Sequence, residues 1–369
     1  MNKKKYIVGV IGICLFIFIG TFSLKARASA VVSGDCGENL TWIYDDLLET
    51  LTISGTGDMD SYDSEDAVLD GGTQAPWHAY ITSRGKNLTV QVGEGVTSIG
   101  KSAFEGGAAI KKVGLPSTIE SIDNFAFAFC KNLRTISFPY GLNTIGIRSF
   151  YDCENLDSIQ LPDSVTKVGN YAFAFAKGAT ALKLSASMQV ISMGTFFQCE
   201  GIKEAAFPTQ LTAVRAYAFG GCKQLTKIVF PETVTKIGTG AFSFTGNELQ
   251  FYGYADTRAS RYAQAMAIPF ISMDAEILDL TVSEVLGDRA KLSFTGLPGV
   301  MEYSLYCFNE TLGVYEFFTD ITATEYLITG LSSGQSTRYK IRTSQRHGTF
   351  TYFGKFSNEA VVTTLADGI

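Results

Sequence analysis

Cysteine, histidine and clustered carboxylate side chains are the groups through which this 369-residue chain could do chemistry. The chain has seven cysteines but only two histidines, His78 and His347. Two histidines leave little for a histidine-dependent catalytic centre or a histidine-rich metal site. The sequence also contains no HExxH, P-loop or GxSxG motif, and no Cys/His spacing typical of a nucleophile with its base. We therefore predict no catalytic residue, no metal ligand and no cofactor, and hence a protein that is not an enzyme.

Carboxylates gather in one short segment, Asp58–Asp70. Clustered oxygens of this kind could hold calcium, but their spacing is not that of an EF-hand loop. Paired carboxylates could also hydrolyse a glycosidic bond, although no second motif accompanies them. A solvated loop is the interpretation that we favour. The six acidic residues are Asp58, Asp60, Asp63, Glu65, Asp66 and Asp70.

Four cysteines stand at one position of a repeating pattern, three residues after a phenylalanine. They are Cys130, Cys153, Cys199 and Cys222. Other repeats place Gly107, Ala176 or Thr245 at this position. Because small residues replace one another there, we favour buried free thiols. Disulfides between neighbouring repeats are the alternative, for which parallel Cβ directions give unsuitable geometry.

The phenylalanines of this pattern recur seven times at a constant spacing of 23 residues. The series, which we call the ladder, runs Phe104, Phe127, Phe150, Phe173, Phe196, Phe219 and Phe242. A unit this short cannot bury its apolar residues alone, so neighbouring units must stack. The alternation in Leu133–Phe138 predicts a strand, which the next proline ends. We expect seven coils over residues 93–253, with the ladder and the four cysteines as structural residues.

Units such as Leu115–Phe138, LPSTIESIDNFAFAFCKNLRTISF, resemble the BspA-type leucine-rich repeats of bacterial surface proteins. The segments SGDCGENLTWIYDD, LETLTISGTGDMDSY and APWHAYI resemble the N-terminal cap of that family. We place this cap, with an irregular first coil, at residues 31–92. The resemblance implies a leucine-rich-repeat solenoid, mainly β with short helical turns, and a binding or adhesive role with diverse ligands.

The repeat pattern ends before the C-terminus. Residues 254–273, with a helix expected from about Thr257 to Met266, are predicted to close the open end of the core. Residues 275–366 contain short alternating runs separated by turns, which predict a β-sandwich. Their order resembles a fibronectin type III domain, through YLITGLSSGQSTRYKIRT and FSNEAVVTTL. In surface proteins such a domain is more often a spacer than a ligand site.

Residues 1–30 have three lysines near the start, then an uncharged apolar stretch, then small residues spaced for signal peptidase. We predict a signal peptide, with an uncleaved membrane anchor as the alternative; both place the rest of the chain outside the cytoplasm. That remainder has 25 basic against 36 acidic residues, so nucleic acid is not an expected partner. We expect a secreted or cell-surface monomer that contacts membrane only through an uncleaved N-terminal segment.

Aromatic residues flank the ladder in several units. Two residues before a ladder phenylalanine stand Phe125, Tyr171 and Tyr217, and two after it stand Phe129, Phe175 and Phe244. If these side chains emerge on one edge, they form a stripe that can anchor a protein or glycan ligand. The alternative is that they shield the corner of each coil.

These observations predict an exported bacterial binding or adhesion protein. It would recognise an extracellular protein or glycan, of host or microbial origin, through the solenoid surface and without catalysis. A structural scaffold or spacer of the cell envelope is the alternative. An enzyme that acts on glycans or peptides is the least favoured function.

Overall fold

The computed structural model describes residues 31–63, 73–83, 85, 87–274, 277, 279–297, 300, 302–347 and 349–366. The chain divides into two compact units. The first comprises the chain up to Ile228 together with Thr233–Leu249, and the second comprises Val229–Glu232 together with Gln250–Ile369. The predicted export signal, residues 1–30, lies outside the described residues. Within the described part of the chain, no helix is long and apolar enough to cross a membrane.

The first unit begins with three antiparallel strands, β1 (Val31–Gly37), β2 (Leu40–Asp45) and β3 (Thr50–Gly55). Alternate residues of β2 are buried, as expected for a strand with one face on the core. β3 then pairs in parallel with β5 (Leu88–Val92), so the sheet changes from antiparallel to parallel where the repeats begin. The short helix α2 (His78–Ile81) precedes β5.

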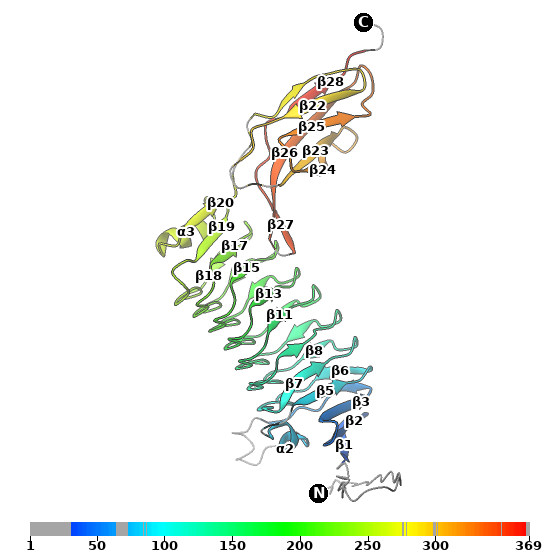
Figure 1. The fold of residues 1–369 in the computed structure, drawn as a ribbon, viewed down its shortest axis with the longest axis vertical. Coiled ribbons are helices and arrows are strands. Elements are labelled where there is room, and N and C mark those ends of the chain that lie inside the picture. Colours follow the sequence, from blue (N-terminus) through cyan, green and yellow to red (C-terminus); the bar gives the residue numbers. More distant parts are fainter. Residues whose placement is uncertain are drawn as a thin grey trace, which may run out of the picture. The chain divides into compact units, whose positions relative to one another are not determined.

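Each repeat contributes two short strands, and the strands of successive repeats pair in parallel (Figure 1). The first row continues from β5 through β7 (Ile110–Gly114), β9 (Thr135–Ile136), β11 (Ser158–Gln160), β13 (Ala181–Lys183), β15 (Glu204–Ala206) and β17 (Lys227–Val229). The second row comprises β4 (Gly57–Asp58), β6 (Val96–Ile99), β8 (Ser121–Ile122), β10 (Thr144–Ile145), β12 (Lys167–Val168), β14 (Val190–Ile191), β16 (Ala213–Val214) and β18 (Lys236–Ile237). This stack of coils is a β-solenoid, in agreement with the repeat prediction.

The ladder phenylalanines stack along the core of the solenoid. Ring centroids of successive members lie 5.0, 5.3, 5.1, 6.0, 5.1 and 5.8 Å apart. The first six members are fully buried, and Phe242 is 5% exposed. The indole of Trp77 stacks on Phe104 at 5.4 Å and therefore extends the ladder into the N-terminal segment.

The second unit contains β19 (Gln250–Gly253), which pairs in parallel with β20 (Phe270–Ser272), and between them helix α3 (Arg258–Ala265). The Thr257 hydroxyl accepts a hydrogen bond from the backbone N–H of Ser260 and caps this helix. The helix occupies the segment in which the sequence predicted one. Its function as a cap remains a prediction.

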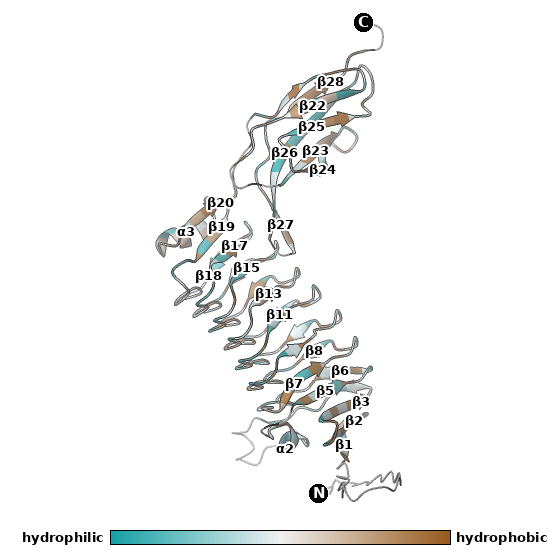
Figure 2. Ribbon diagram, viewed as in Figure 1, coloured by the Kyte–Doolittle hydropathy of each residue, from teal (hydrophilic) through white to brown (hydrophobic). Residues whose placement is uncertain are grey.

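Two antiparallel sheets complete the second unit. One joins β21 (Thr281–Ser283), β22 (Arg289–Ser293) and β25 (Glu325–Thr329). The other joins β24 (Val314–Ile321), β23 (Glu302–Asn309), β26 (Ser336–His347), β27 (Phe350–Phe353) and β28 (Ala360–Thr363). Hydrophilic and hydrophobic residues alternate along these strands (Figure 2). Residues of both sheets, among them Leu292 and Ile341, share one buried cluster.

Candidate functional site

The six aromatic residues predicted as a ligand stripe all have left-handed backbone conformations, with φ between 56° and 64°. This is a property of their two positions in the repeat. Every residue two before a ladder phenylalanine has positive φ: Ser102, Phe125, Arg148, Tyr171, Gly194, Tyr217 and Gly240. Every residue two after it also does: Gly106, Phe129, Asp152, Phe175, Gln198, Gly221 and Phe244. The turn between the two strands of each coil thus contains two left-handed residues.

Bulky residues are unusual at such positions. Glycine adopts positive φ without a steric penalty, whereas a residue with a Cβ pays roughly 1–2 kcal/mol. The structure shows one compensation. The Tyr171 ring lies over Gly194 of the next coil, and the Tyr217 ring lies over Gly240, so closely that a Cβ on either glycine would collide with the ring. Aromatic and glycine residues therefore alternate because they pack against each other.

Two aromatic residues that the stripe prediction missed connect its members. Tyr151 makes edge-to-face contacts with Phe129 and Phe175, at 5.5 and 5.2 Å between ring centroids. Phe197 makes the same kind of contact with Phe175 at 5.6 Å, and with Tyr217 at 6.4 Å. Both stand directly after a ladder phenylalanine, in the coils between those that carry the predicted residues. That position was the sequence signal that could have identified them.

We call the surface formed by the six predicted residues together with Tyr151 and Phe197 the aromatic edge. Phe129, Tyr217 and Phe244 are 39%, 41% and 79% exposed. Phe125, Tyr171 and Phe175, by contrast, are half-buried. The edge thus combines both alternatives of the sequence analysis, because some rings shield the coil and others face solvent.

One cation lies among these rings. The Arg148 guanidinium carbon is 5.8 Å from the ring centroid of Phe125, 5.3 Å from that of Tyr151 and 5.7 Å from that of Tyr171. Such cation–π contacts stabilise an exposed arrangement by about 0.5–1 kcal/mol each. Arg148 therefore fills the space between the aromatic residues of the coils before and after its own.

A groove of about 730 Å³ runs along the second row of strands. Five strands line it, from β4 to β12, and most of the lining side chains are small or polar. Asn124 and Ile147 belong to the lining and directly precede positions of the aromatic edge and its arginine. The Asn124 Oδ1 accepts a hydrogen bond from the Ile147 N–H at 2.6 Å, which joins two coils at this border. Sequence analysis did not predict this groove.

Three carboxylates of the predicted acidic segment are described, and they have local structural partners. Asp58 accepts a hydrogen bond from the Thr97 hydroxyl at 2.7 Å, and this bond with that of Ser98 lowers the pKa of Asp58. Asp63 accepts from the Thr73 N–H at 2.8 Å. Glu65, Asp66 and Asp70 lie outside the described residues. Among the residues that are described, no three His, Cys, Asp or Glu side chains are grouped to hold a metal.

The four ladder cysteines are buried and carry free thiols. Each thiol donates a hydrogen bond to the carbonyl of the ladder phenylalanine one coil earlier, for example Cys130 to Phe104 at 3.1 Å and Cys222 to Phe196 at 3.2 Å. Burial raises the pKa of the Cys130 and Cys222 thiols from 9.0 to about 12. These thiols are therefore packing groups rather than nucleophiles.

This burial predicts a loss of stability at alkaline pH. Below pH 9 the thiols are protonated in both states, whereas above it only the unfolded thiols ionise, which favours unfolding. The stability advantage of the wild type over Cys222→Ala should therefore shrink as pH rises from about 9 to about 12. Denaturant titrations of both proteins across this range measure it. A difference that stays constant with pH would contradict the assignment.

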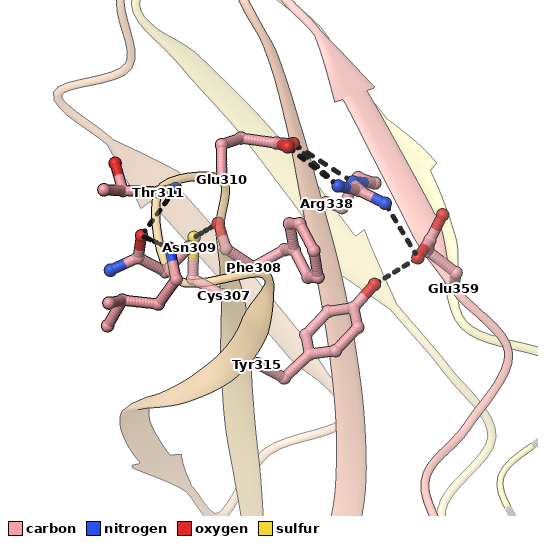
Figure 3. A network of polar contacts seen from close by, with 9 residues as sticks. Cys307, Phe308, Asn309, Glu310, Thr311, Tyr315, Arg338 and Glu359 are labelled. Carbon is pink, nitrogen blue, oxygen red and sulfur yellow. Dashed lines mark hydrogen bonds and ion pairs between the residues drawn. The ribbon is translucent and has the colours of Figure 1, made fainter.

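A polar network in the second unit closes on itself (Figure 3). The Arg338 guanidinium donates to both carboxylate oxygens of Glu310 at 2.9 Å and lies 3.6 Å from the ring centroid of Phe308. Tyr315 donates to Glu359, whose carboxylate also lies 4.0 Å from Arg338. Since the charges of this network are paired with one another, we assign it a structural function.

Comparison with known proteins follows the repeat geometry. A family model described as the BspA type leucine rich repeat region, in six copies, matches residues 83–178 and 144–252. No curated protein matches this chain.

Several solved structures are similar to it. A leucine-rich repeat protein from Bacteroides ovatus has 21% identity over 60% of this chain and 61% of its own, with a TM-score of 0.44. One from Eubacterium ventriosum has 24% identity over 60% of this chain and 66% of its own, with a TM-score of 0.41. One from T. pallidum has 20% identity over 64% and 98%, with a TM-score of 0.45. The match thus spans less than two thirds of the first two proteins. The family match itself covers the stacked coils, and residues 83–252 of this chain are similar to BspA-type leucine-rich repeats.

Proposed function

We propose that this chain is an exported bacterial protein, displayed on the cell surface or secreted, that binds an extracellular protein or glycan through its coils without catalysis. The family match supports a repeat-based binding function. The charge and apolar pattern of residues 1–30 supports export. Residues 254–273 would close the solenoid, and residues 275–366, with their two antiparallel sheets, would form a fibronectin type III-like spacer.

The observation that carries this proposal is the exposure of large aromatic rings on strained backbone. If the turns required only a left-handed residue, glycine would serve at lower conformational cost, as it does at Gly106 and Gly221. Phe129, Tyr217 and Phe244 instead hold 39–79% of their surface in solvent. Aromatic side chains in rigid turns are suited to anchor a ligand, because little side-chain entropy is lost on binding.

The test is a triple variant, Phe129→Ser, Tyr217→Ser and Phe244→Ser. Because these rings are the exposed ones, we expect binding to fall at least about tenfold while the thermal unfolding midpoint changes little. The secreted form is screened by surface plasmon resonance against immobilised collagen, mucin and bacterial cell-wall glycans. The variant is then compared on each surface that the wild type binds.

A matched control replaces two exposed aromatic residues outside the edge, Tyr140→Ser and Phe317→Ser, which are 85% and 57% exposed. This control should bind like the wild type. Equal binding by the triple variant would remove the aromatic edge from the site. A large drop in its unfolding midpoint would show that these rings are core, and the site assignment would also fail.

A further inference from the structure

The groove along the second row of strands contains a straight row of polar side chains. Strand pairing sets Asp58 beside Ser98, Ser98 beside Ser121, Ser121 beside Thr144, and Thr144 beside Lys167. Four parallel strand spacings of about 4.8 Å give the row a length of about 19 Å. An acidic and a basic residue stand at its two ends, and three hydroxyls stand between them.

The central hydroxyls differ from others in the solenoid. Elsewhere a hydroxyl often donates to a carbonyl of the preceding coil, as Thr118 does to Val96 at 2.8 Å and Ser164 to Leu142 at 2.7 Å. For Ser121 and Thr144 no side-chain hydrogen bond is found within the described residues. Both hydroxyls are half-buried in the groove lining. They therefore keep a donor and acceptors for a ligand.

The floor beside this row is flat. Gly100, Gly146 and Gly169 line the groove two residues after the row position of their coils. A Cβ at Gly146 or Gly169 would lie 2.5 Å from backbone atoms of the preceding coil, so no side chain fits there. At one border, Ile147 adds an apolar side chain that is 43% exposed. The groove thus combines a hydroxyl row, a floor without side chains and an apolar wall.

We infer that this groove binds an extended, uncharged carbohydrate chain that lies along the row. The inference rests on the proposed function and names the ligand class. Sugar hydroxyls, like those of serine and threonine, both donate and accept hydrogen bonds, and the row offers them without a central charge. The C–H face of a sugar ring can lie against the flat floor and the apolar wall. The strand spacing is close to the length of one pyranose ring in an extended chain, so successive sugars would meet equivalent hydroxyls.

An extended peptide fits this groove less well. Peptides that bind along strands usually add to an exposed sheet edge, where free backbone N–H and C=O groups give affinity. The groove is lined instead by the face of a sheet whose strands β6, β8 and β10 are paired on both sides. Its backbone groups are therefore already engaged in the ladder.

The experiment measures binding of the secreted form to four soluble polysaccharides, β-glucan, β-mannan, xylan and starch, by affinity electrophoresis and calorimetry. Wild type should bind at least one of them. The double variant Ser121→Ala with Thr144→Val removes two hydroxyls while it keeps side-chain shape, and should weaken binding at least about tenfold. Ser121→Lys, which fills the groove, should abolish it. The matched control Thr135→Val with Ser158→Ala removes hydroxyls from the first row of strands and should bind like wild type.

The results separate this inference from the proposed function. Failure of the wild type to bind any of the four polysaccharides overturns the inference, as does undiminished binding by both groove variants. Binding to collagen or mucin polypeptide that is lost only in the aromatic-edge variant also overturns it, and leaves the proposed function in place. Loss of polysaccharide binding in folded groove variants, checked by circular dichroism, supports it.

Discussion

Replacing Phe150 by alanine should lower the free energy of unfolding of the solenoid by about 3–5 kcal/mol. The side chain is fully buried and stacks between Phe127 at 5.3 Å and Phe173 at 5.1 Å. It also receives the edge of Phe138 at 5.5 Å. Alanine would therefore leave a cavity in the middle of the ladder, where coils above and below cannot collapse without breaking strand pairing. Guanidinium titration followed by circular dichroism measures the loss.

Phe150→Leu is the matched control for this prediction. Leucine keeps most of the buried volume and loses the aromatic stacking, so its destabilisation should be clearly smaller. Because each coil contacts only its neighbours, hydrogen exchange should show the largest loss of protection in the coils around residue 150. A loss below about 1 kcal/mol for the alanine variant would contradict the ladder as the main core.

Trp77→Ala is expected to destabilise the N-terminal end of the solenoid by about 3–5 kcal/mol. The indole is fully buried, stacks on Phe104 and packs edge-to-face against Trp42 at 5.9 Å. Its Nε1–H also donates to the Ala103 carbonyl at 2.7 Å. The substitution would therefore open the first coil to solvent and leave a buried carbonyl without its donor. Thermal unfolding monitored by tryptophan-independent circular dichroism tests this.

The control at this position is Trp77→Phe. Phenylalanine keeps the stacking on Phe104 but cannot donate to Ala103, so the expected loss is intermediate, with about 1–3 kcal/mol from the unpaired carbonyl. Equal stability of Trp77→Phe and wild type would show that the hydrogen bond contributes little. Equal stability of Trp77→Ala and wild type would refute the assignment of Trp77 to the core.

The solenoid could be predicted from the sequence because its strongest signal is periodic. A phenylalanine every 23 residues, each preceded by a small residue, is sufficient to define the stack and its core. The strand expected in Leu133–Phe138 is present as β9, shortened to Thr135–Ile136. The second row of strands was not predicted. Strands such as Ser121–Ile122 are two residues long, and alternation cannot be recognised over two residues.

The candidate site was predictable only in part. Spacing placed Phe125, Tyr171 and Tyr217 at one repeat position, but their left-handed backbone is a property of the turn and leaves no residue preference in these coils. The groove was beyond sequence reasoning for another reason. Its row begins at Asp58, which belongs to the irregular segment before the repeats, and only strand pairing brings it beside Ser98.

The packing of aromatic rings over glycines limits how this array can change length. The Tyr171 ring lies over Gly194 and the Tyr217 ring over Gly240, so a coil with a large residue at this position is followed by one with none. Loss or duplication of a single coil there would bring two large turn residues together, or two glycines. Loss or duplication of a pair preserves every contact. In this part of the solenoid the unit that genetic recombination can insert or delete without structural damage is therefore two coils.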